Sequence, residues 1–241
     1  MPAATVRDSE VARFDALAAS WWDPNGPMRP LHRMNPARIG WIVARVAEAF
    51  STPAGLALLD VGCGAGLAAE ALAARGFDVL GIDAAAGPIA AATAHAADAG
   101  PAGRSLKLAY RVAAPEHLLA ESRRFPIITA LEVIEHVADP GSFVATLAAL
   151  LAPGGLLVLS TLNRTGASFV GAKLAAEYLL HWLPVGTHDW RQFLTPAELG
   201  ALVRAAGLRV SDVTGLAPNP ISGGWRIGAG TRVNYLLAAR S

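Results

Sequence analysis

Two glutamates and a histidine lie within five residues of one another, after an apolar run that predicts a strand from Pro126 to Leu131. If the chain turns helically after this strand, Glu132, Glu135 and His136 fall at positions i, i+3 and i+4 on one face. Two carboxylates and an imidazole suit a divalent ion such as Mg²⁺ or Zn²⁺. In a second interpretation His136 is a general base that Glu135 orients, and in a third the segment is an exposed acidic turn that caps the next helix.

A glycine-rich turn predicts a second site, which binds a nucleotide-like molecule. Asp60 ends a strand-like apolar run, and glycines follow at alternate positions, as Gly62, Gly64 and Gly66. Glycine allows the backbone to approach a ligand closely. The dinucleotide fingerprint requires its third glycine at the next position, where this chain has Leu67, so the pattern disfavours NAD.

Asp83 lies at the tip of the next predicted strand, where an acid can accept hydrogen bonds from both ribose hydroxyls. This pairing of turn and acid is more specific than the turn alone. Cys63, inside the turn, is the only cysteine of the chain, which excludes an internal disulfide and a multi-cysteine zinc site. Its place favours a small filler over a reactive thiol.

Strands and helices alternate along the chain, which predicts a doubly wound, mostly parallel α/β sheet of seven strands. The expected strands are 56–61, 77–82, 106–111, 126–131, 156–160, 208–214 and 233–239. The last strand follows a loop rather than a helix, so we expect it to pair antiparallel, as a hairpin partner. In such a sheet, ligands bind outside the carboxyl ends of the strands, where both predicted sites lie.

The chain, residues 1–241, is predicted to form one domain with additions. Its parts are an N-terminal helical cap (1–54), a cofactor-binding core (55–160), an apolar helical insertion after the fifth strand (161–194), and a C-terminal helix and strand hairpin (195–241). At the start of the last part, Thr195 and Glu198 have the spacing of a capping box.

Composition excludes some classes of function. Lys and Arg number 20 against 19 Asp and Glu, a net charge of +1, which is too small a surplus for binding a phosphate backbone. The N-terminus carries charges and lacks the apolar core of a signal peptide, and the uncharged apolar stretches are too short to span a bilayer. We therefore expect a cytoplasmic protein without a nucleic-acid partner.

Taken together and in order, the motifs resemble those of the ubiquinone-biosynthesis O-methyltransferases, within the class I S-adenosylmethionine-dependent methyltransferases. The resemblance runs through nearly the whole chain. Besides the two sites above, it is carried by Phe14-Asp15, Trp21-Trp22-Asp23, residues 30–36, 160–164 and 186–189, and Asn234-Tyr235. It implies a Rossmann-like fold and transfer of methyl groups to phenolic hydroxyls of polyprenylated catechols, namely 2-polyprenyl-6-hydroxyphenol and 3-demethylubiquinol.

The resemblance also implies roles for single residues. The expected S-adenosylmethionine contacts are Arg38, Gly62, Asp83 and Leu131, and the expected metal ligands are Glu132, Glu135 and His136. Arg38 suits the methionine carboxylate through a charge-assisted pair. A divalent ion would stabilise the phenolate and so lower the pKa of the phenol. The chain departs from the pattern at Ala113-Ala114, which offers no side-chain acceptor for the adenine amino group.

Residues 168–190 are rich in apolar and aromatic side chains and carry few charges. Leu179, Trp182 and Leu183 share one helical face beside a polar stripe, which is typical of a helix on a membrane surface. A lid helix packed on the protein's own core fits the same pattern. Because the implied substrate carries an isoprenoid tail, we expect peripheral contact with the inner leaflet, and the resemblance adds a ubiquinone-biosynthesis complex as a partner.

Two other functions remain open. The chain could use the same cofactor on another small acceptor, or it could be a noncatalytic subunit that only binds a nucleotide. The ligand set at positions 132, 135 and 136 favours a metal-bound catechol over amine or carbon acceptors, which do not generally need such ligands. Turnover of labelled cofactor separates an enzyme from a binding subunit.

Overall fold

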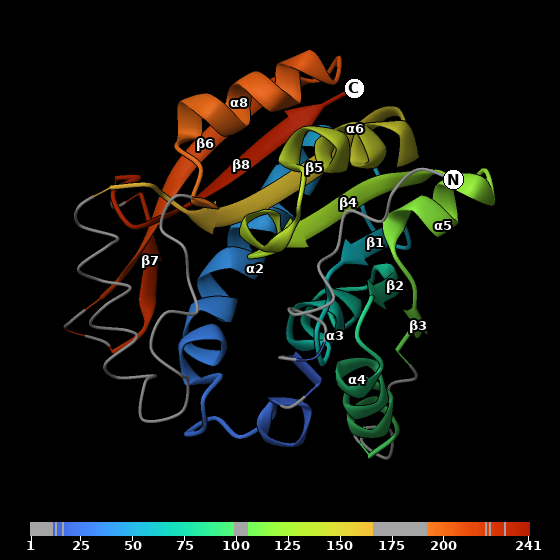
Figure 1. Cartoon of the computed structure of the whole chain (residues 1–241), viewed down its shortest axis with the longest axis vertical. Coiled ribbons are helices and arrows are strands. Elements are labelled where there is room, and N and C mark those ends of the chain that lie inside the picture. Colours follow the sequence, from blue (N-terminus) through green and yellow to red (C-terminus); the bar gives the residue numbers. More distant parts are fainter. Residues whose placement is uncertain are drawn as a thin grey trace.

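Short apolar runs separated by helix-forming segments give the chain one central sheet with helices on both faces (Figure 1). The structure is a computed structural model. It describes residues 17–98, 106–165, 192–219, 223–228 and 230–241, with residues 12, 14, 15 and 221.

Eight strands lie within these residues and form a single sheet. They are β1 (Ala57–Val61), β2 (Asp78–Asp83), β3 (Leu108–Val112), β4 (Phe125–Leu131), β5 (Leu151–Leu162), β6 (Arg209–Pro218), β7 (Trp225–Ile227) and β8 (Asn234–Arg240). Their order is β3-β2-β1-β4-β5-β8-β6-β7. The first five are parallel, and β8 is antiparallel to both of its neighbours.

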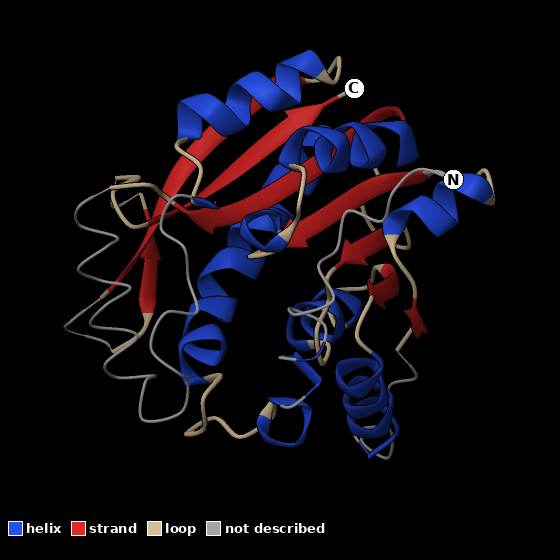
Figure 2. Cartoon of the chain, viewed as in Figure 1, coloured by secondary structure: helices blue, strands red, loops and turns tan. Residues whose placement is uncertain are grey.

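Helices cover both faces of the sheet (Figure 2). They are η1 (Ala18–Ser20), α2 (Arg29–Ala49), α3 (Leu67–Ala73), α4 (Ala86–Asp98), α5 (Pro115–Ala120), η3 (Ile134–His136), α6 (Pro140–Leu150) and α8 (Pro196–Ala205). Side chains alternate along a strand, so neighbours in β1 enter different cores. Leu58 packs among residues of α2 and α3, whereas Leu59 packs among residues of α5, α6 and α8.

The predicted fold class is confirmed, and two details of the prediction, the number of strands and the length of the fifth, are wrong. The sheet has eight strands rather than seven, because the three residues of β7 pair with β6. The last strand is antiparallel and pairs with β6, as expected, and it also pairs with β5. The strand expected at 156–160 is longer, because β5 already pairs with Phe125 at Leu151 and continues after a register irregularity.

Helix starts follow the local sequence signals. Thr195 and Glu198 form the predicted capping box, with the Glu198 carboxylate accepting from the Thr195 N–H at 2.8 Å. Within the N-terminal part, a helix predicted by the apolar period from Ile39 to Phe50 is longer in the structure, because α2 begins at Arg29 and includes Pro36. Pro30, in the first turn, is compatible with this earlier start, since the first helical residues need no intrahelical N–H partner.

The division of the chain into cap, core, insertion and C-terminal part stays a prediction. Most of the expected insertion, including Leu179, Trp182 and Leu183, lies outside the described residues. Among the described helices, none combines the length and apolar character needed to cross a bilayer.

Candidate functional site

The glycine turn joins β1 to α3 in the conformation that the sequence predicted. Gly62, Gly64 and Gly66 all have positive φ, at +66°, +54° and +89°. A side chain is also excluded by space, because a Cβ on Gly64 would lie 2.3 Å from the Trp21 ring and one on Gly62 would lie 2.5 Å from Val133. These positions of the turn therefore require glycine.

Asp83, at the end of β2, fastens this turn. Its Oδ2 accepts from the Gly64 N–H and its Oδ1 from the Ala85 N–H, both at 2.9 Å. Burial raises the pKa of Asp83, and the backbone hydrogen bonds partly offset that effect. A carboxylate offers about four acceptor positions, so two ribose hydroxyls can still be accepted. The structure thus brings Asp83 to the turn, as the sequence predicted.

Asp60 lies buried beneath the turn, with 2% of its surface exposed. Its Oδ1 accepts from the Thr129 hydroxyl at 2.6 Å, and its Oδ2 has no hydrogen-bond partner among the described residues. Burial raises the pKa of Asp60 to about 6. A buried acceptor without a partner is costly, so this atom fits a ligand that brings a cationic or N–H donor.

Arg38 supplies the complementary charge from α2. It is 4% exposed, and its Nε donates to Asn35 Oδ1 at 2.9 Å. Burial lowers the pKa of Arg38, while attraction to Glu132 and then to Asp60 opposes that effect. The guanidinium therefore lies in the field of one acid of the turn and one acid of the β4 end. Such a buried cation suits a carboxylate ligand.

Leu131, the last residue of β4, is 8% exposed and packs in the core on the α2 and α3 face. Glu132 follows it with φ at +58°, a left-handed conformation that is uncommon for a residue with a long side chain. η3 then covers only residues 134–136.

The expected helical face of Glu132, Glu135 and His136 is therefore wrong. Glu132 precedes the short η3 turn, and the side chains have separate partners. Ser160 and Asn234 donate to the Glu132 carboxylate, and Thr161 donates to Glu135 Oε2 at 2.8 Å. The His136 ring lies edge-on to Phe14, with centroids 5.4 Å apart.

The three side chains do not form a metal-ligand set as they are placed. In the part of the chain that the structure describes, no group of three or more His, Cys, Asp or Glu residues gathers around a common point. Glu135 is 4% exposed, and burial, followed by repulsion from Glu132, raises its pKa to about 7. It is thus a buried acid tied to β5 rather than a solvent-facing ligand.

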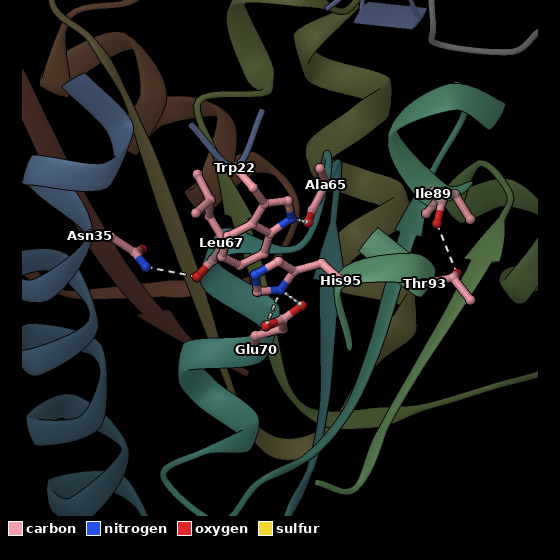
Figure 3. Close-up of polar contacts among 8 residues, drawn as sticks. All are labelled: Trp22, Asn35, Ala65, Leu67, Glu70, Ile89, Thr93 and His95. Atoms are coloured by element: carbon pink, nitrogen blue, oxygen red, sulfur yellow. Dashed lines mark hydrogen bonds and ion pairs between the residues drawn. The ribbon is translucent and has the colours of Figure 1, made fainter. Parts of the chain in front are cut away.

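The N-terminal segment covers the glycine turn, a role that the sequence did not reveal. Trp22 donates from Nε1 to the Ala65 carbonyl at 2.9 Å and stacks on His95 of α4 (Figure 3). The Glu70 carboxylate contacts His95 Nδ1 at 3.0 Å. Asn35 adds a bond of 2.7 Å to the Leu67 carbonyl at the start of α3. The cap is therefore joined to the turn, to α3 and to α4.

Sequence reasoning also assigned no role to the polar residues that hold Glu132. Ser160 and Asn234 are 0% and 2% exposed, and they come from β5 and β8. A signal was available, since polar residues inside apolar strands need hydrogen-bond partners, but the partner itself was not identifiable from spacing.

Comparisons with known proteins identify the family and the fold. A family described as "Methyltransferase domain" matches residues 31–213. Among solved structures, the magnesium protoporphyrin IX methyltransferase from Synechocystis PCC 6803 with bound SAH is similar in fold. Its TM-score is 0.66 at 17% identity, over 95% of this chain and 94% of that chain.

The fold and the matched family together define a methyltransferase. Two curated relatives are each named "Ubiquinone biosynthesis O-methyltransferase". The one from Azorhizobium caulinodans is 46% identical, over 98% of this chain and 94% of its own length. The one from Methylobacterium nodulans is 47% identical, over 98% and 95%. The chain belongs to the ubiquinone biosynthesis O-methyltransferase family.

Proposed function

We propose that this chain transfers the methyl group of S-adenosylmethionine to a phenolic hydroxyl of a polyprenylated catechol. The observation that carries the proposal is that the buried Arg38 is attracted electrostatically to two acids at one sheet edge, Glu132 and Asp60. Arg38 suits the carboxylate of a zwitterionic methyl donor, and Asp60 suits its ammonium group. The Glu132 carboxylate can accept a hydrogen bond from the hydroxyl of the methyl acceptor. The shared name of the relatives supports the acceptor class.

In this proposal the donor lies across the glycine turn. Arg38 pairs with its methionine carboxylate, and the unpartnered Oδ2 of Asp60 accepts from its ammonium group. Asp83 accepts from the ribose hydroxyls, and Leu131 provides an apolar wall. The turn glycines at 62, 64 and 66 allow the backbone to approach the donor. S-adenosylmethionine supplies the electrophilic methyl group.

Methyl transfer forms an oxygen–carbon bond as the sulfur–carbon bond breaks, giving a methyl ether and S-adenosylhomocysteine. The phenol proton passes to a base at the same edge, where Glu132, Glu135 and His136 are the proposed catalytic groups. Holding both reactants in line converts a bimolecular reaction into one within a single complex, which supplies much of the rate. The rest comes from removal of the proton.

Whether the reaction needs a divalent ion is a separate question, which an experiment must answer. Binding one would require Glu132 to leave Ser160 and Asn234, and Glu135 to leave Thr161. Turnover after dialysis against EDTA, with and without added Mg²⁺ or Zn²⁺, measures whether an ion is needed. Restoration by one ion would support the proposed ligand set, and full activity in EDTA would contradict it.

The activity itself is tested with methyl-labelled S-adenosylmethionine and a short-chain prenyl catechol. We expect one methyl ether for each S-adenosylhomocysteine, and the two family substrates, 2-polyprenyl-6-hydroxyphenol and 3-demethylubiquinol, should both serve in detergent. A matched acceptor with one hydroxyl already methylated controls for the need for a diol. Cofactor binding without transfer to either substrate would favour the noncatalytic alternative.

The membrane contact of residues 168–190 belongs to the same proposal and rests on the sequence pattern. Liposome flotation compares the protein with a variant in which Leu179, Trp182 and Leu183 are changed to Ser. We expect the variant to float less, because apolar burial in the interface drives such binding. Equal flotation would favour a lid, and recovery of partner proteins from membranes would test the proposed biosynthetic complex.

A further inference from the structure

The side-chain amide nitrogen of Asn234 faces both oxygens of one carboxylate. Asn234 is the first residue of β8, and its Nδ2 lies 3.0 and 2.9 Å from the two oxygens of Glu132. A carboxylate without a proton only accepts, so the amide nitrogen and not the oxygen must face it. As a result, Asn234 Oδ1 is buried with no hydrogen-bond partner among the described residues.

This arrangement is costly for a residue whose role is only structural. Buried amides in folded proteins nearly always satisfy both the donor and the acceptor. Among the described residues, Asn234 Oδ1 has no partner, whereas Nδ2 faces an acid at the carboxyl edge of the sheet. We therefore take the role of the Asn234 amide to be its hydrogen bonding to the Glu132 carboxylate.

Ser160 holds the same carboxylate from the neighbouring strand. Its hydroxyl donates to Glu132 Oε1 at 2.6 Å, and its carbonyl accepts from the Glu132 N–H at 3.0 Å. These bonds fix a glutamate whose backbone has φ at +58°. A left-handed conformation at a non-glycine residue persists where the surroundings determine it, and such residues are frequent at active sites.

The orientation of Glu132 is also connected to the donor side of the site. Its neighbour Val133 packs against Gly62 of the glycine turn, and its charge attracts the buried Arg38. A carboxylate that turned away from Ser160 and Asn234 would change both relationships.

We propose that Asn234 and Ser160 are positioning residues for methyl transfer, which hold the Glu132 carboxylate in the orientation that meets the acceptor hydroxyl. This inference rests on the proposed function, in which Glu132 is a catalytic group. Neither residue touches the reactants. Both act through one carboxylate, from two different strands.

The test measures kcat and the KM values for S-adenosylmethionine and 3-methylcatechol. The single variants are Asn234→Ala, Ser160→Ala and Glu132→Ala, and a double variant combines Asn234→Ala with Glu132→Ala. Hydrogen bonds to a charged group correspond to about 10-fold or more, so each of the first two variants should lose about 10-fold in kcat. Their KM for S-adenosylmethionine should change by less than about twofold. In the Glu132→Ala background, Asn234→Ala should cost less than about twofold, because it acts through that side chain.

Conservative variants separate positioning from folding. Ser160→Thr keeps the hydroxyl and should restore most of the activity, while Asn234→Asp keeps the shape but places a second acid against Glu132 and should lose more activity than Asn234→Ala. Ser211→Ala is the matched control, since it removes a 3.1 Å bond from β6 to the Ala238 carbonyl of β8, the strand that carries Asn234. It should leave kcat unchanged.

The outcomes are distinguishable. Wild-type protein that binds S-adenosylmethionine but methylates no catechol would contradict the proposed function and this inference with it. Wild-type turnover with an unchanged kcat in Asn234→Ala and Ser160→Ala would contradict the inference alone. A full 10-fold loss from Asn234→Ala in the absence of the Glu132 carboxylate would also contradict it, because the amide would then act elsewhere.

Discussion

The indole of Trp22 is stacked on the imidazole of His95, with ring centroids 3.3 Å apart and ring planes 3° apart. The same indole donates to the Ala65 carbonyl inside the glycine turn. Trp22 therefore connects the N-terminal segment to α4 and to the backbone that is proposed to hold the methyl donor. This contact joins the cap to the proposed cofactor site.

Two substitutions of Trp22 should weaken cofactor binding to different extents. Trp22→Phe keeps a ring for stacking but loses the bond to Ala65, so we expect the Kd for S-adenosylmethionine to rise about threefold. Trp22→Ala loses the stacking as well, and the Kd should rise about 10-fold or more. Isothermal titration calorimetry measures both. Trp41→Phe is the control, since Trp41 packs in the core of α2, and equal Kd changes at the two tryptophans would contradict this explanation.

Alanine substitutions at Gly64 and Gly76 separate the effect of backbone strain on stability from the effect of steric clash. Gly64 and Gly76 both have positive φ, but a Cβ on Gly64 would meet the Trp21 ring at 2.3 Å, whereas Gly76 has nothing within 4 Å. Gly76→Ala should cost about 1–2 kcal/mol of stability and leave cofactor binding intact. Gly64→Ala should cost more, because the added Cβ overpacks the turn, and it should reduce S-adenosylmethionine affinity more than about 10-fold. Denaturant unfolding and calorimetry decide between this result and similar losses in both variants.

Arg38 should determine affinity for the methionine end of the donor. Loss of a charge-assisted pair corresponds to about 10- to 100-fold, so the Kd for S-adenosylmethionine should rise by that factor in Arg38→Ala. Arg38→Lys should recover only part of it, because a lysine lacks the planar fork. Arg33→Ala changes an exposed arginine of the same helix and should have no effect. An unchanged Kd in Arg38→Ala would remove Arg38 from the proposed site.

The sequence predicted the parts of the site that local pattern determines. Asp60 and Asp83 meet at the glycine turn because parallel strands place their carboxyl ends at one edge, and the apolar period predicts those strands. The Thr195 capping box is likewise local.

The features that the sequence did not predict depend on contacts between residues far apart in the chain. Glu132 adopts its left-handed backbone against Ser160 and Asn234, which follow it by 28 and 102 positions, so helical spacing could not predict its direction. The Trp22 contact with Ala65 spans 43 positions. β7 has only three residues, too few for a period to show.

The buried Asp60 should make the stability of the ligand-free protein depend on pH. Burial raises its pKa from the usual 3.8 to about 6, so the folded protein holds this proton more tightly than the unfolded chain does. Protonation therefore favours folding, and this contribution is fully present below about pH 4 and lost as the pH rises through about 6. The loss corresponds to about 3 kcal/mol at pH 8.

Asp60→Asn cannot ionise and keeps an acceptor for the Thr129 hydroxyl. We expect the variant and the wild type to have similar unfolding free energies near pH 4, and the variant to be the more stable of the two at pH 8. Urea unfolding at both pH values measures the difference. The ligand should reverse the order at high pH, because saturating S-adenosylmethionine brings its ammonium to the ionised Asp60 and stabilises the wild type by mass action. A difference that does not change between pH 4 and pH 8 would show that Asp60 ionises in the folded protein at its ordinary pKa.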